Sequence, residues 1–150
     1  MRALVQRVRE ARVNVGGETI ASIDAGLLVF AGFGVEDASD DREWIARKLL
    51  DLRIFDDEHG VMNRSVIDTH GQVLAVSQFT LFASTRKGNR PSWSRAAAPE
   101  IAAPAFDAFV QMIEARLGRA VATGRFGANM QVALVNDGPV TIWLDSRERE

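Results

Sequence analysis

Two short segments carry the residues best suited to chemistry. The first is Ser77–Leu81, where Ser77, Gln78 and Thr80 interrupt a run that otherwise has the composition of a buried strand. As a strand, this segment would place Ser77 and Phe79 on one face and Gln78 and Thr80 on the other. Hydroxyls and backbone N–H groups at a strand end can line a pocket, and N–H groups stabilise an oxyanion without an ionisable side chain. The structural alternative is that these hydroxyls only bond neighbouring backbone as the strand leaves the core.

The second segment is Asn136-Asp137-Gly138-Pro139-Val140-Thr141. As plain structure it is a tight turn between two strands, which Asp, Gly and Pro favour. A peptide bond before proline can also be cis at a cost of roughly 0.5–1 kcal/mol, and glycine lets the backbone approach a ligand closely. A rigid Gly138–Pro139 unit could therefore direct its carbonyls into a pocket and distinguish how the substituents of a neighbouring carbon atom are arranged.

The side chains that usually serve as catalytic bases and nucleophiles are scarce. Cysteine is absent from the chain, which excludes disulfides, thiolate nucleophiles and cysteine-based metal sites. The two histidines, His59 and His70, stand in turn-like sequences and are expected in exposed loops. No nucleophile elbow, phosphate-binding loop or dinucleotide fingerprint is present. We therefore expect neither a metal nor a cofactor, and an enzyme with this sequence would work without a side-chain base.

Charge is nearly balanced overall but unevenly distributed. The chain has 18 basic and 20 acidic residues, for a formal net charge of −2. No acidic residue occurs from 69 to 99, and the basic residues of that stretch include Arg86, Lys87, Arg90 and Arg95. Such a loop can present local positive potential to a phosphate. The alternative is an ordinary solvated loop with basic character.

Length and composition indicate one globular domain over residues 1–150. The chain is 47% hydrophobic and 25% charged, which are ordinary values for a folded protein. No run approaches the roughly 20 apolar residues needed to span a membrane. Because Arg7 and Arg9 fall where a signal peptide needs its apolar stretch, we expect a cytoplasmic protein. The charged residues 145–150 are expected to be a frayed tail.

The hydrophobic periodicity predicts an α+β fold with a mostly antiparallel, barrel-like sheet and two main helices. Gly16-Gly17 predicts a hairpin between two strands. Pro99 suits the start of the second helix and Gly118 its end. The expected helices span residues 40–52 and 99–117. The expected strands span residues 3–15, 18–23, 26–33, 53–55, 72–83, 130–135 and 140–144.

The two polar segments, taken in this order and at this separation, resemble the D-aminoacyl-tRNA deacylase family of the D-tyrosyl-tRNA type. Further stretches agree over nearly the whole chain: Gln6-Arg7-Val8, Arg53-Ile54-Phe55, Arg90-Pro91-Ser92, Gly124-Arg125-Phe126 and Met130-Gln131-Val132. The resemblance implies hydrolysis of the ester that joins a D-amino acid to the terminal adenosine of tRNA. It also implies removal of glycine mischarged onto tRNA(Ala).

The resemblance further implies a homodimer in which the Gly-Pro motif of one subunit reaches the active site of the other. Gly138 and Pro139 would form a cis unit whose carbonyls reject an L side chain, and Arg7 would hold this loop. A glycyl ester has no side chain for these carbonyls to reject and would therefore also be hydrolysed.

The resemblance assigns roles to the first segment as well. Ser77 and Gln78 would orient the substrate, backbone N–H groups near Phe79 would stabilise the oxyanion, and a ribose hydroxyl of the tRNA would assist the attack. For Thr80 we expect a hydroxyl that bonds the backbone or shapes the pocket rather than a nucleophile, because no base is available to activate it. Lys87, Arg90 and Arg95, together with Arg86, would meet phosphates of the tRNA acceptor stem.

Other readings stay open on the sequence alone. A non-catalytic tRNA-binding homodimer would use the same basic loop, and a structural homodimer would use Gly138–Pro139 only as an interface lock. An ordinary esterase is disfavoured by the missing triad. Related deacylases carry a trans Gly-Pro unit, and the sequence does not fix the isomer.

Overall fold

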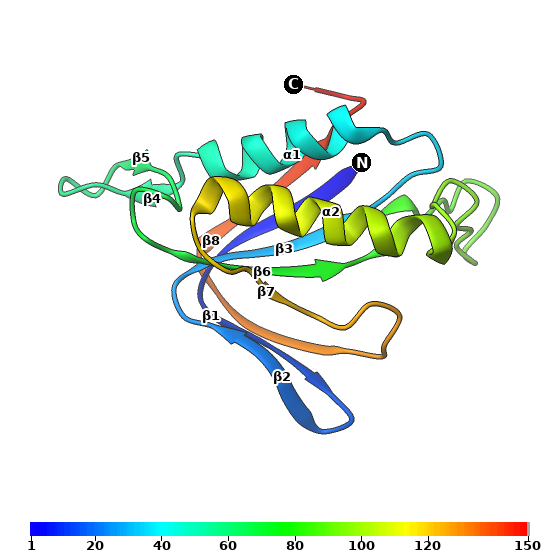
Figure 1. Cartoon of the computed structure of the whole chain (residues 1–150), viewed down its shortest axis with the longest axis horizontal. Helices are drawn as coiled ribbons and strands as arrows, with labels where there is room; N and C mark the ends of the chain where they lie inside the picture. The colour runs from blue at the N-terminus through cyan, green and yellow to red at the C-terminus, as the bar shows by residue number, and fades with distance from the viewer. Residues whose placement is uncertain (150) are drawn as a thin grey trace.

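Two helices, α1 (Ser39–Asp51) and α2 (Pro99–Leu117), lie side by side across one face of a curved sheet (Figure 1). The structure is a computed structural model and describes residues 1–149. The main sheet contains β1 (Arg2–Val15), β2 (Glu18–Ile23), β3 (Gly26–Gly32), β6 (Gln72–Ser77), β7 (Ala122–Thr123) and β8 (Gln131–Asp145). A small second sheet pairs β4 (Phe55–Asp56) with β5 (Met62–Arg64), and η1 (Phe79–Phe82) is a short 3₁₀ helix.

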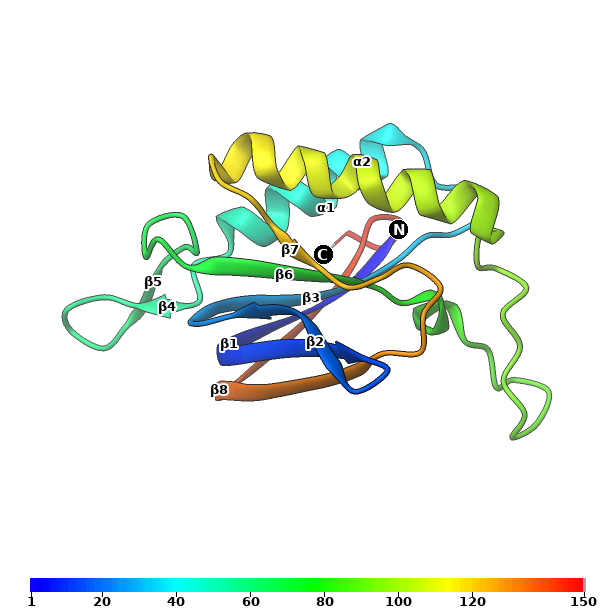
Figure 2. The same ribbon diagram turned by 60° about the horizontal axis from the view of Figure 1, so that its bottom comes forward.

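The long strand β1 organises the sheet, because it pairs antiparallel with β2, β3 and β8. The pairs β3–β6 and β6–β7 are parallel, because each is joined by a crossover that contains one of the helices. The sheet curls into a barrel-like shape (Figure 2). The predicted α+β class with two main helices is confirmed, and the sheet is mixed. No helix within residues 1–149 is long and apolar enough to cross a membrane.

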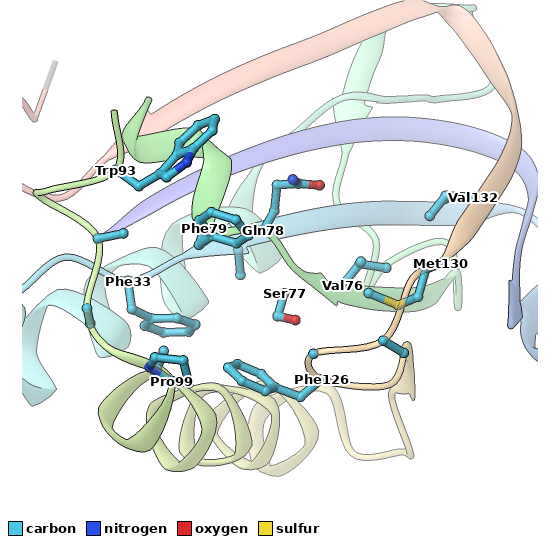
Figure 3. Close-up of a pocket in the computed structure, with 16 residues that line it drawn as sticks. Phe33, Val76, Ser77, Gln78, Phe79, Trp93, Pro99, Phe126, Met130 and Val132 are labelled. Atoms are coloured by element: carbon cyan, nitrogen blue, oxygen red, sulfur yellow. The ribbon is translucent and has the colours of Figure 1, made fainter. Parts of the chain in front are cut away.

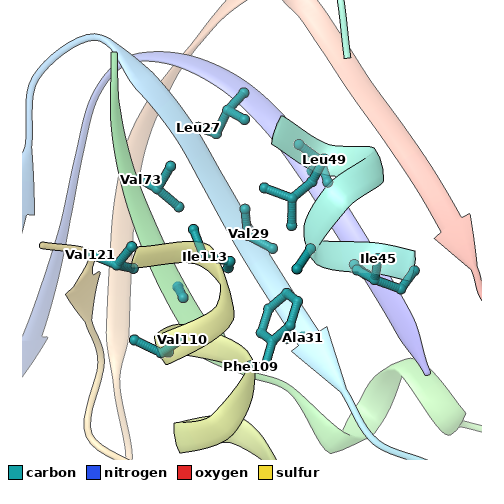
Figure 4. Packing of buried hydrophobic residues seen from close by; sticks show 14 of the residues in the cluster. Leu27, Val29, Ala31, Ile45, Leu49, Val73, Phe109, Val110, Ile113 and Val121 are labelled. Atoms are coloured by element: carbon teal, nitrogen blue, oxygen red, sulfur yellow. The ribbon is translucent and has the colours of Figure 1, made fainter. Parts of the chain in front are cut away.

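The main core fills the space between the helices and the sheet. Phe109 and Ile113 of α2 and Leu49 of α1 are fully buried and pack over Leu27 and Val29 of β3 (Figure 4). A second, smaller cluster covers the opposite face of the sheet. This double burial explains why β3 and β6 are apolar along almost their whole length, as strands covered on both faces must be. It also makes the ends of these two strands a rigid base for the segments that follow them.

Several predicted boundaries are confirmed. Gly16 and Gly17 form the β1–β2 turn with φ of +60° and +86°. Helix α2 begins at Pro99 and ends at Gly118, which has φ of +74° in the left-handed region. The Gly118 N–H donates to the Glu114 carbonyl and closes the last turn.

The prediction that one strand continues from residue 72 to 83 is wrong. Strand β6 ends at Ser77, opposite Ala31 near the end of its partner β3. The Gln78 N–H donates to the Ala31 carbonyl, after which the chain turns into η1. The predicted alternation of faces from Ser77 to Thr80 therefore does not occur.

The prediction of two strands joined by a turn at residues 136–139 is also wrong. Strand β8 runs continuously from Gln131 to Asp145 because β1 is long enough to pair with both of its halves. Gln6 pairs with Thr141 and Val8 with Asn136, so the residues between them form a bulge. Gly138 and Pro139 therefore stand at a bend inside an edge strand.

The expected frayed tail does not begin at residue 145. Asp145 and Ser146 are buried, and the Ser146 N–H donates to the Met1 carbonyl over 2.9 Å. The guanidinium of Arg149 lies 5.0 Å from the ring centre of Trp44. Ser146 is thus held by the start of the chain and Arg149 lies against α1, and Glu150 lies outside the described residues.

Candidate active site

A cavity of about 510 Å³ opens beside the end of β6, and it holds three of the predicted site residues: Ser77, Gln78 and Phe79 (Figure 3). The opposite wall comes from α2 and from the segment between β7 and β8. Among residues 1–149, the cavity is lined without any ionisable side chain. Its other lining residues are Ala31, Phe33, Val76, Trp93, Ala96, Ala97, Pro99, Ala102, Phe126, Gly127, Ala128, Met130 and Val132.

The polar groups of the cavity come from the turn between β6 and η1. Ser77 directs its hydroxyl into the cavity, while the Gln78 side chain, which also lines the cavity, extends away from its centre (Figure 3). Phe79 opens η1, and the first N–H groups of a helix have no acceptor within the helix itself. Within residues 1–149 the Phe79 N–H donates no backbone hydrogen bond outside η1. The turn can therefore offer an unpaired N–H and a hydroxyl to a carbonyl group placed in the cavity.

Thr80 lies in the same turn but does not line the cavity. Its hydroxyl accepts a hydrogen bond from the side-chain amide of Gln78. This bond fixes the orientation of Gln78 at the rim. The Thr80 oxygen is consequently a support for its neighbour and not a group exposed to a bound ligand.

Aromatic rings form much of the cavity wall, and two of them, Trp93 and Phe126, had no predicted site role. Phe79 and Trp93 meet edge to face with ring centres 5.3 Å apart, and Phe126 lies across the cavity near α2 (Figure 3). Phe79 is 55% exposed and Trp93 is 38% exposed. Large apolar side chains left exposed at the rim of a cavity are typical of ligand contact. The signal available in the sequence was Trp93 itself, a bulky apolar residue within a polar loop.

The Gly138–Pro139 bend is exposed and is fixed by polar contacts. The peptide bond between the two residues is cis, and Gly138 has φ of +142°. The Asn136 side chain closes the bend, because its Oδ1 accepts the Val140 N–H over 2.8 Å and its Nδ2 donates to Thr141 Oγ1 over 2.9 Å. Any β-carbon on Gly138 would lie 2.7 Å from Val140 Cγ2. Only glycine fits this position without displacing its neighbours.

Arg7 supports the bend from inside the molecule. Its Nε donates to the Asp137 carbonyl over 2.8 Å, and its Nη1 donates to the Ile54 carbonyl over 2.5 Å. The side chain is 10% exposed, and its charge faces the Asp56 carboxylate at 3.5 Å. The guanidinium therefore ties the bend to the segment before β4. Arg7 was expected to hold the Gly138–Pro139 loop, and the structure places its guanidinium on the residue before Gly138.

The predicted site divides into two separate regions within one chain. Ser77, Gln78 and Phe79 line the cavity, whereas Arg7, Gly138 and Pro139 do not. The bend faces solvent on the outer strand of the sheet. The bend therefore contributes no residue to the cavity of the same chain.

The basic loop forms a third region. It joins η1 to α2, projects from one end of the molecule (Figure 2), and is closed by paired backbone bonds between Ser84 and Ser92. The four residues predicted to contact tRNA are exposed in this loop: Arg86, Lys87, Arg90 and Arg95. None of the four lines the cavity. The same loop carries Trp93 to the cavity rim.

Comparisons with known proteins identify the family. The family model described as D-Tyr-tRNA(Tyr) deacylase matches residues 4–145. Proteins named D-aminoacyl-tRNA deacylase from Chromobacterium violaceum and Dechloromonas aromatica are 61% and 58% identical over 150 residues, with full coverage of both chains. A solved structure titled "c-Myc DNA Unwinding Element Binding Protein" is similar with a TM-score of 0.91 and 42% identity, covering 97% of this chain and 98% of that one.

A further solved structure, titled as a probable eukaryotic D-amino acid tRNA deacylase, has a TM-score of 0.81 at 17% identity. It covers 95% of this chain and 97% of that one, and its likeness concerns the fold alone. The family match spans both the cavity wall at Ser77–Phe79 and the bend at Gly138–Pro139. The chain belongs to the D-Tyr-tRNA(Tyr) deacylase family.

Proposed function

We propose that this protein hydrolyses the ester between a D-amino acid and the 3′ end of tRNA, releasing the free amino acid and the tRNA. Full-length relatives at about 60% identity carry the name of this activity. The observation that carries the proposal is the polar turn of Ser77–Phe79 at a cavity lined without ionisable side chains. Such a cavity suits an ester that is polarised and positioned, rather than attacked by a side chain.

The reaction then divides between protein and substrate. Water adds to the ester carbonyl, and the developing oxyanion accepts a hydrogen bond from the Phe79 N–H. The bond to the ribose oxygen then breaks, and the proton lost by the water passes to that oxygen. Ser77 and Gln78 orient the ester. Because no lining side chain of the described chain can take the proton from water, the neighbouring ribose hydroxyl of the terminal adenosine assists the attack. Thr80 contributes no nucleophile, since its hydroxyl is engaged by Gln78 and faces no base.

In this proposal the protein is a homodimer, and the Gly138–Pro139 bend of one subunit selects the D configuration at the cavity of the other. The hydrogen bonds of Arg7 and Asn136 hold the bend in place, so that its backbone can exclude a side chain that would overlap with it. A side chain in the L configuration would collide with the backbone of the bend, whereas the hydrogen at that position in a D-amino acid would not. Glycyl-tRNA, including glycine on tRNA(Ala), would also be hydrolysed because glycine has no side chain to exclude.

The basic loop would bind the tRNA acceptor stem through its phosphates. Arg86, Lys87 and Arg90 are exposed, and the loop that carries them reaches the cavity rim at Trp93. Phosphate contacts confer affinity that depends on salt and not on base sequence. Reversing the charges of Arg86 and Lys87 should weaken tRNA binding and flatten its dependence on salt; unchanged binding and slope would remove the loop from the proposal.

The test is hydrolysis of D-aminoacyl-tRNA, the matching L form and glycyl-tRNA, each incubated with the purified protein in the absence of added metal. We expect loss of the D and glycyl esters while the L ester survives. Gly138→Ala and Pro139→Ala should lower the ratio of D to L hydrolysis. Gly118→Ala is a matched control, because Gly118 also has positive φ but lies at the end of α2.

Two outcomes would favour other functions. Retention of tRNA without hydrolysis of any ester would favour a non-catalytic tRNA-binding homodimer. Equal hydrolysis of D and L esters would leave an esterase and remove the selective role given to Gly138 and Pro139.

A further inference from the structure

Arg2 links the start of β1 to the turn that carries the cavity wall. Its Nε donates to Asp145 Oδ2 over 2.8 Å, and its Nη1 donates to the Leu81 carbonyl over 3.0 Å. Its guanidinium carbon lies 4.7 Å from the ring centre of Phe82 and 5.6 Å from that of Trp143. One side chain therefore joins both ends of the chain to the last turn of η1.

The pair formed by Arg2 and Asp145 is largely shielded from water. The two side chains are 16% and 6% exposed. Burial works to raise the pKa of Asp145, but the Arg147 N–H and the Arg2 guanidinium outweigh it and hold the pKa below its usual range. Asp145 therefore stays charged at neutral pH and keeps the guanidinium in one orientation. A fork of donors can bind a carboxylate and a carbonyl at once, which an ammonium group does less well.

The opposite end of the same turn is held by backbone contacts. The Gln78 N–H donates to the Ala31 carbonyl over 2.8 Å. A β-carbon on Gly32 would lie 2.8 Å from the Gln78 carbonyl oxygen and 3.2 Å from Leu81 Cβ, so η1 packs directly on the backbone of β3. The turn is thus fixed at Gln78 by the sheet and at Leu81 by Arg2. Phe79 lies between these two anchors. Among residues 1–149 its N–H donates no backbone hydrogen bond outside η1.

We propose that Arg2 is a positioning residue for the cavity wall, holding η1 so that Phe79 and its backbone N–H keep their place beside the cavity. This inference rests on the proposed function, in which that N–H meets the oxyanion. Arg2 touches neither the cavity nor the bend, so it acts on the rate and not on chiral selection.

The informative variant is Arg2→Met, which keeps the length of the side chain and removes its charge and donors. A displacement of about 1 Å in a catalytic group can cost up to about 100-fold in rate. For a turn still anchored at Gln78, we expect kcat on the D ester to fall about tenfold while KM changes less than about twofold. The ratio of D to L hydrolysis should stay unchanged. Arg2→Lys should recover part of the loss, and Asp145→Asn should reproduce part of it.

Hydrogen exchange supplies a measurement that is independent of activity. In Arg2→Met, exchange should accelerate in residues 78–83 and stay unchanged in β6 and α2. Arg12→Met is the matched control, because Arg12 is an exposed arginine near the other end of β1. It should alter neither kcat nor exchange in residues 78–83.

The results separate failure of this inference from failure of the proposed function. If kcat per folded molecule and exchange in residues 78–83 both stay at wild-type values, or exchange rises equally across the sheet, Arg2 has no positioning role. If the wild-type protein hydrolyses no ester, the proposed function fails, and acceleration confined to residues 78–83 would still demonstrate the anchor. If Arg2→Met does not fold, Arg2→Lys and Asp145→Asn carry the same test.

Discussion

The η1 wall of the cavity and the Gly138–Pro139 bend are built by different forces. The wall follows a doubly buried strand and rests on the backbone of β3, where Gly32 permits close approach. The bend lies in an outer strand and is held by side-chain hydrogen bonds from Arg7 and Asn136. Steric changes should therefore damage the wall, and loss of polar groups should damage the bend. If the two regions divide the reaction as proposed, the first kind of change lowers rate and the second lowers selectivity.

The largest effect is expected from Gly32→Ala. The added methyl group would lie 2.8 Å from the Gln78 carbonyl oxygen, which belongs to the backbone and cannot move alone. We expect hydrolysis of the D ester to fall about 100-fold and the protein to lose about 1–3 kcal/mol of stability. Single-turnover hydrolysis and denaturant unfolding measure the two effects. Wild-type rates in a stable variant would show that the position of η1 does not limit the reaction.

Arg7→Met should act on the other region. It leaves the Asp137 and Ile54 carbonyls without their charged donor, and bonds of this kind contribute about 1.5–3 kcal/mol each. We expect the ratio of D to L hydrolysis to fall at least about tenfold, while the D ester is hydrolysed within about threefold of the normal rate. The ratio is measured on matched D and L esters. A large fall in D hydrolysis with an intact ratio would contradict the division of roles.

Asn136→Ala should have a smaller effect of the same kind. It removes the acceptor of the Val140 N–H but leaves Arg7 in place. We expect the D to L ratio to fall about fivefold, which corresponds to a neutral hydrogen bond worth about 1 kcal/mol. Asn136→Asp keeps the acceptor and is the control, which should retain most of the ratio. If the D to L ratio falls equally in both variants, the hydrogen bond from the Val140 N–H to Asn136 is not what supports selectivity.

The smallest effect is expected from Thr80→Ala. The hydroxyl only accepts a bond from Gln78 and does not line the cavity. The rate on the D ester should change by less than about threefold, as expected for a lost rim contact. Complete loss of activity, together with an acyl-enzyme trapped in the wild type, would make Thr80 the nucleophile and overturn this account of the wall.

Local sequence signals predicted those parts of the fold that local forces determine. The start of α2 at Pro99, its end at Gly118 and the Gly16–Gly17 hairpin follow from backbone preferences alone. The end of β6 at Ser77 could not be predicted in this way, because it depends on where the partner strand β3 ends. The continuity of β8 depends likewise on the unusual length of β1.

The candidate site shows the same limit. Ser77–Phe79 and Gly138–Pro139 stood out because polar residues, glycine and proline interrupt apolar runs. The aromatic wall of Trp93 and Phe126 was missed, because exposed rings become informative only when the fold gathers them around a cavity. Arg2 was missed for a similar reason, since its partners Leu81 and Asp145 lie 79 and 143 residues away in the sequence.

The central claim is that the bend of one chain filters substrate at the cavity of another, and mixing two variants tests it directly. Gly32→Ala has an impaired cavity and an intact bend, whereas Gly138→Ala has the reverse. With a large excess of Gly32→Ala chains and subunit exchange verified by native mass spectrometry, most Gly138→Ala cavities acquire an intact bend from their partner. We predict that the D to L ratio of the mixture rises toward the wild-type value. A ratio that stays at the value of Gly138→Ala alone would contradict the claim.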